Sequence, residues 1–260
     1  MKNKEPFTSK SFAIYFACIS FVQNILSFLL GGEKCICCSK NTLTIPLCKS
    51  CLEKLWEPWP YEACQRCGRR LISERNLCTQ CREKSVLKNV DAAFSLHDYQ
   101  LWKKNLLFAW KLENKRSLSP YFAALFYQKL KALEEREGKL IPVVPVPPRK
   151  GKIREKGWDQ IDELCFYLKR GWNVKVLHLL ERTSSVQQKK LGRLERLKTI
   201  DSSYHLKQGH KVKKLLESPP ELVVLADDIL TTGSTLEGCA RELKRGGIKK
   251  VYSITLFIVE

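Results

Sequence analysis

The stretch "VVLADDILTTGST", residues 223–235, decides the fold. Four apolar residues lead into two adjacent carboxylates, Asp227 and Asp228, and then into a loop of small residues, 231–235. A short apolar run is typical of a strand buried in a parallel sheet, and a small-residue loop before a helix presents backbone N–H groups that favour a phosphate. The two carboxylates would repel that phosphate. We therefore expect them to face the vicinal hydroxyls of a ribose on the same ligand, with Mg²⁺ as a bridging ion.

The sequence around this stretch alternates between strand and helix signals. Strand-like runs occupy 90–99, 139–147, 173–180, 221–227 and 249–259, and apolar residues follow helical spacing in 100–112, 119–136, 159–170, part of 184–198 and 234–247. Ser119 is expected to cap the second of these helices, with Pro120 as its first residue. The alternation predicts an α/β fold in which helices flank a parallel sheet and ligands bind at the carboxyl ends of the strands.

The cysteines predict two zinc sites. Eight of the twelve form four pairs with the same Cys-x-x-Cys spacing: Cys35/Cys38, Cys48/Cys51, Cys64/Cys67 and Cys78/Cys81. Two such pairs supply four thiolates to one structural zinc ion. A disulfide framework is the alternative to zinc, and both sequential and crossed sharing of the pairs stay open. Cys37 could also replace Cys38 as a ligand. Because the segment has few apolar residues, we expect the metal to supply its folding free energy.

The N-terminal segment differs from the rest of the chain. Residues 11–30 contain 15 apolar residues in 20, preceded by Lys2, Lys4 and Lys10. We expect a helix that packs against the zinc module or a partner, with a spanning or peripheral membrane anchor as the alternative. The predicted organisation is therefore an N-terminal helix or extension (1–30), a double zinc ribbon (31–83) and an α/β domain (84–260). A cytoplasmic location is expected, because cysteine thiolates remain reduced there.

The charge of the chain is strongly basic. There are 46 lysines and arginines against 27 acidic residues, a net charge of +19, and residues 139–214 alone hold 19 basic and 7 acidic residues. A hydrophobic content of 44% over 260 residues is enough for a substantial core and excludes a disordered chain. The basic excess indicates a polyanionic partner such as a phosphorylated small molecule or nucleic acid, unless it is only a solvated surface.

The residues of the opening stretch carry a resemblance to a known family. The stretch resembles the phosphoribosyl-pyrophosphate (PRPP) motif of type I phosphoribosyltransferases, and residues 35–260 are similar to the ComF family, in which a cysteine-rich zinc module precedes such a domain. The resemblance implies that Asp227 and Asp228 position the ribose 2′- and 3′-hydroxyls, with or without magnesium. It also implies that Thr231, Thr232, Gly233, Ser234 and Thr235 surround the 5′-phosphate.

A second segment extends the resemblance. "PVPPRKGKIREKGWDQ", residues 145–160, resembles a strand end that contacts pyrophosphate, followed by a mobile flap. Pro147, Arg149, Lys150 and Lys156 are the expected pyrophosphate residues, and Lys152 and Arg154 add charge. The chain departs from the family at Lys156, Trp158 and Asp159, where Arg, Phe and Asn are usual. Lysine lacks the bidentate fork of arginine, and the Asp159 carboxylate is expected to work against a polyphosphate.

Other parts of the chain resemble the family less closely. The match continues at Arg182, Gln187 or Gln188, Leu191 and Arg196, with Thr199 in place of a family asparagine, and Lys111 matches a family lysine. A solvated basic face is the alternative explanation for these single cations.

The resemblance implies a PRPP-binding protein with structural zinc and magnesium. Because ComF-family members are associated with DNA uptake and transformation, single-stranded DNA and DNA-processing proteins are the implied partners. An active phosphoribosyltransferase and a PRPP-sensing regulatory protein are the alternatives. Residues 31–83 contain no recognisable site for a base, amide or ammonia, which lowers the expectation of transfer.

Overall fold

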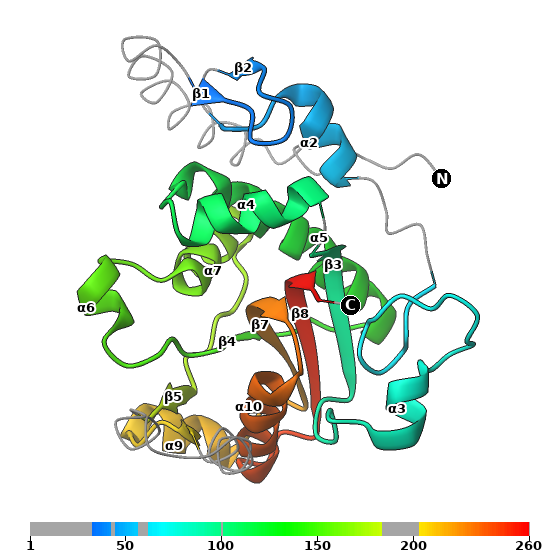
Figure 1. Cartoon of the computed structure of the whole chain (residues 1–260). Coiled ribbons are helices and arrows are strands. Elements are labelled where there is room, and N and C mark those ends of the chain that lie inside the picture. Colours follow the sequence, from blue (N-terminus) through cyan, green and yellow to red (C-terminus); the bar gives the residue numbers. More distant parts are fainter. Residues whose placement is uncertain (1–32, 43–44, 57–61, 100, 184–202, 260) are drawn as a thin grey trace, which may run out of the picture.

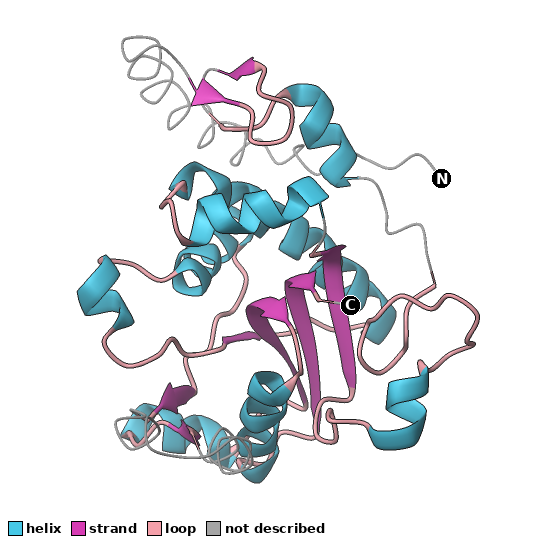
Figure 2. Cartoon of the chain, in the orientation of Figure 1, coloured by secondary structure: helices cyan, strands magenta, loops and turns pink. Residues whose placement is uncertain are grey.

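The computed structural model of the chain describes residues 33–42, 45–56, 62–99, 101–183 and 203–259. Its centre is a parallel sheet of four strands in the order β3-β8-β7-β4. The strands are β3 (Ala92–Asp98), β4 (Val143–Pro145), β7 (Leu222–Leu230) and β8 (Lys250–Ile258). Helices lie on both faces of this sheet (Figures 1 and 2). The predicted α/β fold with a parallel sheet is confirmed.

The apolar run that precedes the two aspartates is buried on both faces of the sheet. Leu222, Val224 and Ala226 pack into one hydrophobic cluster, whereas Val223 and Leu225 pack into the cluster on the opposite face. Because successive side chains of a strand point to opposite faces, a strand covered on both sides needs a continuous apolar run. This requirement explains why β7 shows no polar alternation before Asp227.

Four helices cover the sheet. α4 (Leu101–Lys111), α5 (Ser119–Glu137) and α7 (Gln160–Trp172) contribute residues to the first cluster, and α10 (Ser234–Arg245) contributes residues to the second. A short 3-10 helix (Arg116–Leu118) precedes α5. The remaining elements are α6 (Lys152–Lys156), an antiparallel pair of β5 (Leu180–Arg182) and β6 (Tyr204–Leu206), and α9 (His210–Glu217).

Three local predictions need correction. Residues 173–180 do not form a strand of the sheet. They pair with β4 at one bridge, Val143 to Val176, because Pro145, the next residue of β4 that faces this segment, lacks the N–H group needed to continue the pairing. β7 does not end at the aspartates but continues through Ile229 to Leu230. Ser119 is the first residue of α5 rather than its cap, since the preceding 3-10 turn leads directly into the helix.

The cysteine-rich segment forms two separate units (Figure 1). The first cysteine unit, residues 33–56, contains β1 (Glu33–Lys34), β2 (Asn41–Thr42) and α2 (Lys49–Trp56). Its Cys35, Leu47 and Cys51 pack in the cluster that also holds residues of α4 and α5. The second cysteine unit, residues 62–84, contains α3 (Thr79–Lys84) and lies beside β3, where Ala93 N donates to Arg66 O at 2.9 Å. The proposed boundaries of the three parts stay a prediction.

Two predicted helical segments, 11–30 and part of 184–198, lie outside the described residues. Among the helices within the described ranges, none combines the length and apolarity needed to cross a bilayer.

Candidate functional site

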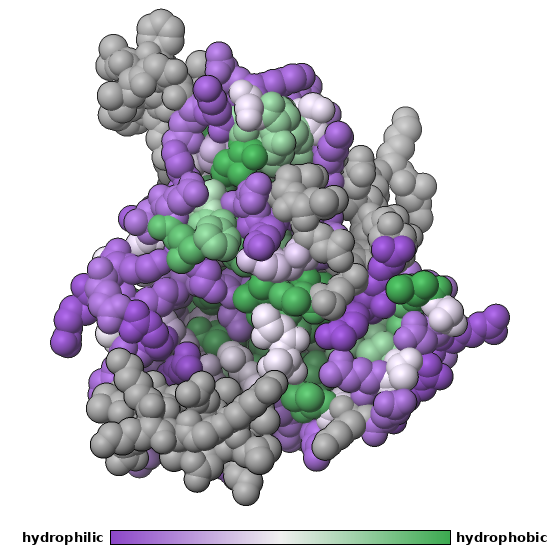
Figure 3. Space-filling view, viewed as in Figure 1, coloured by the Kyte–Doolittle hydropathy of each residue, from purple (hydrophilic) through white to green (hydrophobic). Residues whose placement is uncertain are grey.

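The main cleft opens at the carboxyl ends of β4 and β7, where the topology of a parallel sheet favours ligand binding. It has a volume of about 410 Å³. Its charged lining comprises five cations and three carboxylates: Lys111, Arg149, Lys152, Lys156, Arg182, Asp159, Asp227 and Asp228. In the space-filling view, this side of the molecule is hollowed beside α6, and hydrophilic residues border the hollow (Figure 3). The excess of cations suits an anionic ligand.

Asp228 is held by other residues of the protein. The residue is 5% exposed, and Oδ2 accepts hydrogen bonds from Lys111 Nζ and Gln160 Nε2, both at 2.6 Å. Lys111 is the last residue of α4 and Gln160 is the first residue of α7. The carboxylate therefore joins the end of β7 to two helices from one side of the sheet.

Asp227 has a different environment. It is half-buried and lines the cleft, and its Oδ1 accepts the backbone N–H of Asp228 at 2.9 Å. Burial, and then the neighbouring Asp228 carboxylate, raises the pKa of Asp227 well above the ordinary range of an aspartate. A cation or a pair of hydroxyl donors placed in the cleft would favour the ionised form. Asp227 is thus suited to a ligand that brings such groups.

The phosphate loop, as we name residues 231–235, connects β7 to α10. Gly233 has a φ of +82°, which favours glycine, and it precedes Ser234 at the start of α10. Thr231 and Thr235 line the cleft. The first N–H groups of α10 lack partners within the helix, and its dipole favours an anion at this end. Helix start and cleft therefore meet at one place, as the opening stretch predicts.

Not every predicted phosphate residue reaches the cleft. Thr232 and Gly233 line a smaller cavity on the other side of the loop, together with Thr231. The Thr232 Oγ1 and Ser234 Oγ atoms lie 3.1 Å apart and form a hydrogen bond with each other. The Ser234 N–H group also donates to Thr232 Oγ1, at 3.4 Å. Of the five predicted phosphate residues, Thr231 and Thr235 therefore line the cleft and Thr232, Gly233 and Ser234 do not.

The flap residues contribute unequally. Pro147, Arg149, Lys152 and Lys156 line the cleft, but Lys150 is exposed outside it. Their contact with pyrophosphate stays a prediction. Arg149 forms an ion pair with Glu155. Lys156 Nζ donates to the backbone oxygen of Lys111 at 2.7 Å. These bonds hold Arg149 and Lys156 in the lining of the cleft to which Asp227 and Asp228 also contribute.

Asp159 has a structural role that the sequence analysis missed. Its side chain caps α7 by accepting the N–H groups of Ile161 and Asp162, and it pairs with Lys152 Nζ at 2.5 Å. The carboxylate is therefore paired within the protein, and the same pair offsets the charge of Lys152. An aspartate immediately before an amphipathic helix is a capping signal that could have revealed this role. That Asp159 works against a polyphosphate stays a prediction.

Two further lining residues, Gln160 and Tyr204, were not among the predicted site residues. The Arg182 guanidinium lies 5.3 Å from the centre of the Tyr204 ring, so the two form one wall of the cleft. Tyr204 is remote from the motif in sequence, and no local pattern marks it. Of the remaining family matches, Gln187, Gln188, Leu191, Arg196 and Thr199 lie outside the described residues.

The eight paired cysteines form two clusters that could each hold one metal ion. They are Cys35, Cys38, Cys48 and Cys51 in the first unit, and Cys64, Cys67, Cys78 and Cys81 in the second. Ligand atoms within each cluster lie within 4.8 Å of one another, and neighbouring sulfur atoms are 3.5 Å (Cys38 to Cys48) and 3.7 Å (Cys67 to Cys78) apart. Tetrahedral zinc with Zn–S bonds of about 2.3 Å requires sulfurs roughly 3.8 Å apart, so both clusters fit.

The cluster geometry resolves the open alternatives. The structure groups the pairs sequentially, with Cys38 rather than Cys37 in the first cluster, and the cysteines in the described ranges are free rather than disulfide-bonded. Burial opposes ionisation of Cys35 and Cys64, but backbone N–H groups directed at the sulfurs, from Cys48 and Cys67 respectively, contribute to a lowered pKa of each thiol. Burial instead raises the pKa of the Cys51, Cys67 and Cys81 thiols, so the protein favours the thiolate form at only some positions of each cluster.

Comparison with known proteins gives two similar chains. The chain is 24% identical over 247 residues to Competence protein ComFC of Streptococcus pneumoniae, covering 92% of this chain and 97% of that protein. It is 24% identical over 226 residues to Competence protein F of Haemophilus influenzae, covering 84% and 93%. No protein-family model matches the chain. The similarity extends through the cysteine units and the sheet domain together.

Proposed function

We propose that this protein, whose resemblance to the ComF family is supported by two competence proteins along most of its length, binds PRPP or a related ribose phosphate with Mg²⁺. The observation that carries the proposal is the meeting of three features in one cleft. Asp227 lies near the carboxyl end of β7, the phosphate loop leads into the first turn of α10, and five cations line the walls. Each feature suits a different part of the same ligand.

The 5′-phosphate would lie at the phosphate loop. There the first N–H groups of α10 and the hydroxyls of Thr231 and Thr235 supply donors without competing carboxylates. The ribose hydroxyls would donate to Asp227, either directly or through magnesium. Asp228, which already accepts from Lys111 and Gln160, would fix the end of β7 rather than act as the main ligand group.

The pyrophosphate would lie toward α6. Arg149, Lys152 and Lys156 line that side of the cleft. If transfer to an acceptor occurs, these cations would stabilise the charge that develops on the departing pyrophosphate, and the protein would act mainly by orienting the ligand.

Ligand-induced stabilisation tests this assignment. Thermal unfolding of the zinc-loaded full chain is measured with PRPP, ribose 5-phosphate and pyrophosphate as separate probes, each with Mg²⁺. A ligand at one hundred times its Kd stabilises the folded protein by about 2.7 kcal/mol. PRPP is expected to raise the Tm most, because it occupies both subsites. Equal Tm values with and without all three probes would contradict the proposal.

A role in DNA uptake or DNA handling forms the second part of the proposal. It is supported by the names of the two similar chains and by the net charge of +19. Titration with single-stranded DNA at increasing salt tests the physical basis. If several lysines and arginines contact phosphates, affinity falls steeply as the salt concentration rises. The slope of the logarithm of the binding constant against the logarithm of the salt concentration then reports the number of contacts. If the protein does not bind single-stranded DNA at low salt, its positive net charge does not serve DNA binding, and this part of the proposal fails.

A further inference from the structure

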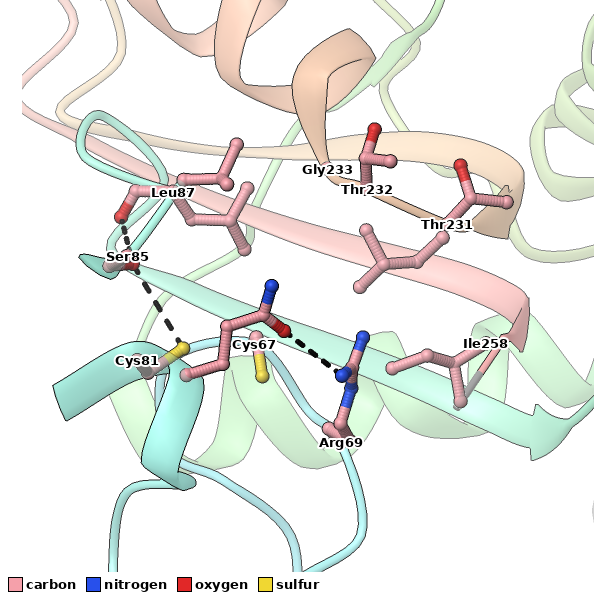
Figure 4. Close-up of a pocket in the computed structure, with 12 residues that line it drawn as sticks. Cys67, Arg69, Cys81, Ser85, Leu87, Thr231, Thr232, Gly233 and Ile258 are labelled. Atoms are coloured by element: carbon pink, nitrogen blue, oxygen red, sulfur yellow. Dashed lines mark hydrogen bonds between the residues drawn. The ribbon is translucent and has the colours of Figure 1, made fainter. Parts of the chain in front are cut away.

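The second cysteine unit lies directly behind the phosphate loop. A cavity of about 40 Å³ separates them, and its lining includes Cys67, Arg69 and Cys81 from the unit and Thr231, Thr232 and Gly233 from the loop. In the close-up, these two groups of residues face each other across the cavity, with Leu87 alongside (Figure 4). The loop therefore has the ligand cleft on one side and a metal-binding unit on the other.

Leu87 fills the space next to Gly233. Leu87 is 3% exposed, and a Cβ atom added to Gly233 would lie 2.8 Å from its Cδ2 atom. The backbone oxygen of Leu87 accepts hydrogen bonds from Arg66 Nε at 2.6 Å and from Ser85 Oγ at 3.2 Å. Arg66 belongs to the second cysteine unit, so the residue that contacts the loop is positioned from that unit.

Glu237 forms a second connection. It lies at the end of the first turn of α10 and is 9% exposed. Its carboxylate accepts hydrogen bonds from Lys88 N at 2.7 Å, from Asn89 N at 2.8 Å and from Asn89 Nδ2 at 2.6 Å. We name residues 85–91, which follow the second unit in the chain, the brace segment. A buried carboxylate with these donors fixes the start of α10 to the brace segment.

The second unit is itself fixed to the sheet. Arg66 O accepts from Ala93 N at 2.9 Å, and a Cβ atom added to Gly68 would lie 2.6 Å from Ala93 O. The unit is thus attached to β3, an edge strand of the sheet, while residues of the unit and of the phosphate loop line one cavity. The first cysteine unit has different contacts, since it packs against residues of α4 and α5 and pairs Glu33 with Lys115 at 2.8 Å.

We propose that the second cysteine unit, acting through Leu87 and Glu237, holds the phosphate loop in the conformation that binds a phosphate. Glu237 and Leu87 are positioning residues in this arrangement, because neither lines the ligand cleft. Metal loss from the second unit loosens the loop, whereas metal loss from the first unit leaves it unchanged. The consequence for ligand affinity rests on the proposed function, but the consequence for loop order does not.

Amide hydrogen exchange of the zinc-loaded full chain without ligand tests the connection. Glu237→Gln is compared with Glu242→Gln, a matched control on the same helix that is 8% exposed and pairs with Arg245. Glu237→Gln replaces the charged carboxylate that accepts the hydrogen bonds of the brace segment. Amide exchange at residues 232–236 is therefore expected to accelerate about tenfold in this variant and not in the control. Exchange in β7 and β8 is expected to stay slow in both variants, which shows that the fold is intact. Equal loop protection in the two variants would overturn the proposal.

A second comparison uses the metals. Cys81→Ser and Cys48→Ser alter half-buried ligands of the second and first clusters, respectively. Each variant is expected to lose one zinc per chain by native mass spectrometry, and only Cys81→Ser to accelerate loop exchange. Equal acceleration of amide exchange in both variants, or no acceleration in Cys81→Ser, would contradict the proposal that the second cysteine unit holds the phosphate loop.

Titration with ribose 5-phosphate then separates this proposal from the proposed function. If the second cysteine unit holds the phosphate loop and the ligand assignment is correct, the affinity for ribose 5-phosphate falls in Glu237→Gln and Cys81→Ser. It does not fall in the controls, Glu242→Gln and Cys48→Ser. If the unaltered protein does not bind ribose 5-phosphate, the ligand assignment fails, while the exchange results still decide whether the second unit holds the loop.

Discussion

Asp227 and Asp228 are adjacent in sequence but differ in their surroundings. Asp228 is bound to Lys111 and Gln160, whereas Asp227 lines the cleft with a raised pKa. The sequence predicted both as equivalent ribose ligands. It could not separate them, because the distinction depends on side chains from α4 and α7 that are far away in the chain.

Replacing Asp227 by Asn is expected to stabilise the unliganded protein at neutral pH. The raised pKa means that folding disfavours the ionised carboxylate. This cost is present above the pKa of the folded state, shrinks as pH falls and disappears near the unfolded value of about 4, where both states bind the proton. Urea unfolding at several pH values measures the difference. A gain for Asp227→Asn that is independent of pH would contradict this assignment.

Replacing Asp228 by Asn is expected to destabilise the protein by about 1–3 kcal/mol, because charged hydrogen bonds to Lys111 and Gln160 are lost. Asp98→Asn is the control, since its pair with Lys103 is more exposed and its loss should cost under about 1 kcal/mol. Urea unfolding of both variants provides the comparison. Equal losses would show that the Asp228 interactions add nothing beyond those of a surface pair.

The elements of the sheet domain were predicted more accurately than the interactions of the site. Apolar periodicity located β7, β8, α5 and α10, because it reflects burial on one or both faces. The same reasoning failed at 173–180, where Pro145 of β4 lacks the N–H group that would continue the pairing beyond Val143. Periodicity reports whether a segment is buried, not whether its neighbour can complete a hydrogen-bond ladder.

The phosphate loop requires glycine at 233 for two reasons, and a pair of variants separates them. Gly233 and Gly138 both have left-handed φ values, +82° and +68°, but only Gly233 has a close neighbour, Leu87. Gly138→Ala should therefore lose about 1–2 kcal/mol from backbone strain alone. Gly233→Ala should lose more in urea unfolding, because the added Cβ atom also displaces Leu87. Identical losses would mean that the contact with Leu87 imposes no constraint.

The molecule as a whole combines a parallel-sheet domain with two cysteine units attached at different places. The Cys-x-x-Cys spacing predicted two clusters of four cysteines, and the structure groups the pairs sequentially. Their attachment could not be predicted, because it depends on long-range contacts such as Glu237 with Lys88 and Glu33 with Lys115. No local pattern in either segment specifies these partners.

Native mass spectrometry of the full chain is expected to find two zinc ions, one for each cluster. Because the units contain few apolar residues, a chelator should unfold them and lower the stability of the whole chain. Circular dichroism during chelation measures the loss of structure. One zinc per chain, or full retention of structure after both ions are removed, would contradict two structural sites.

The central claim is that the cleft binds PRPP through Asp227 and the phosphate loop, and calorimetric titration tests it most directly. PRPP is titrated with and without Mg²⁺ into the zinc-loaded full chain and into Asp227→Asn. The account predicts magnesium-dependent binding by the unaltered protein and a loss of affinity of about tenfold or more in Asp227→Asn, since a charged hydrogen bond is removed. No binding by the unaltered protein, or equal affinity in the variant, would contradict it.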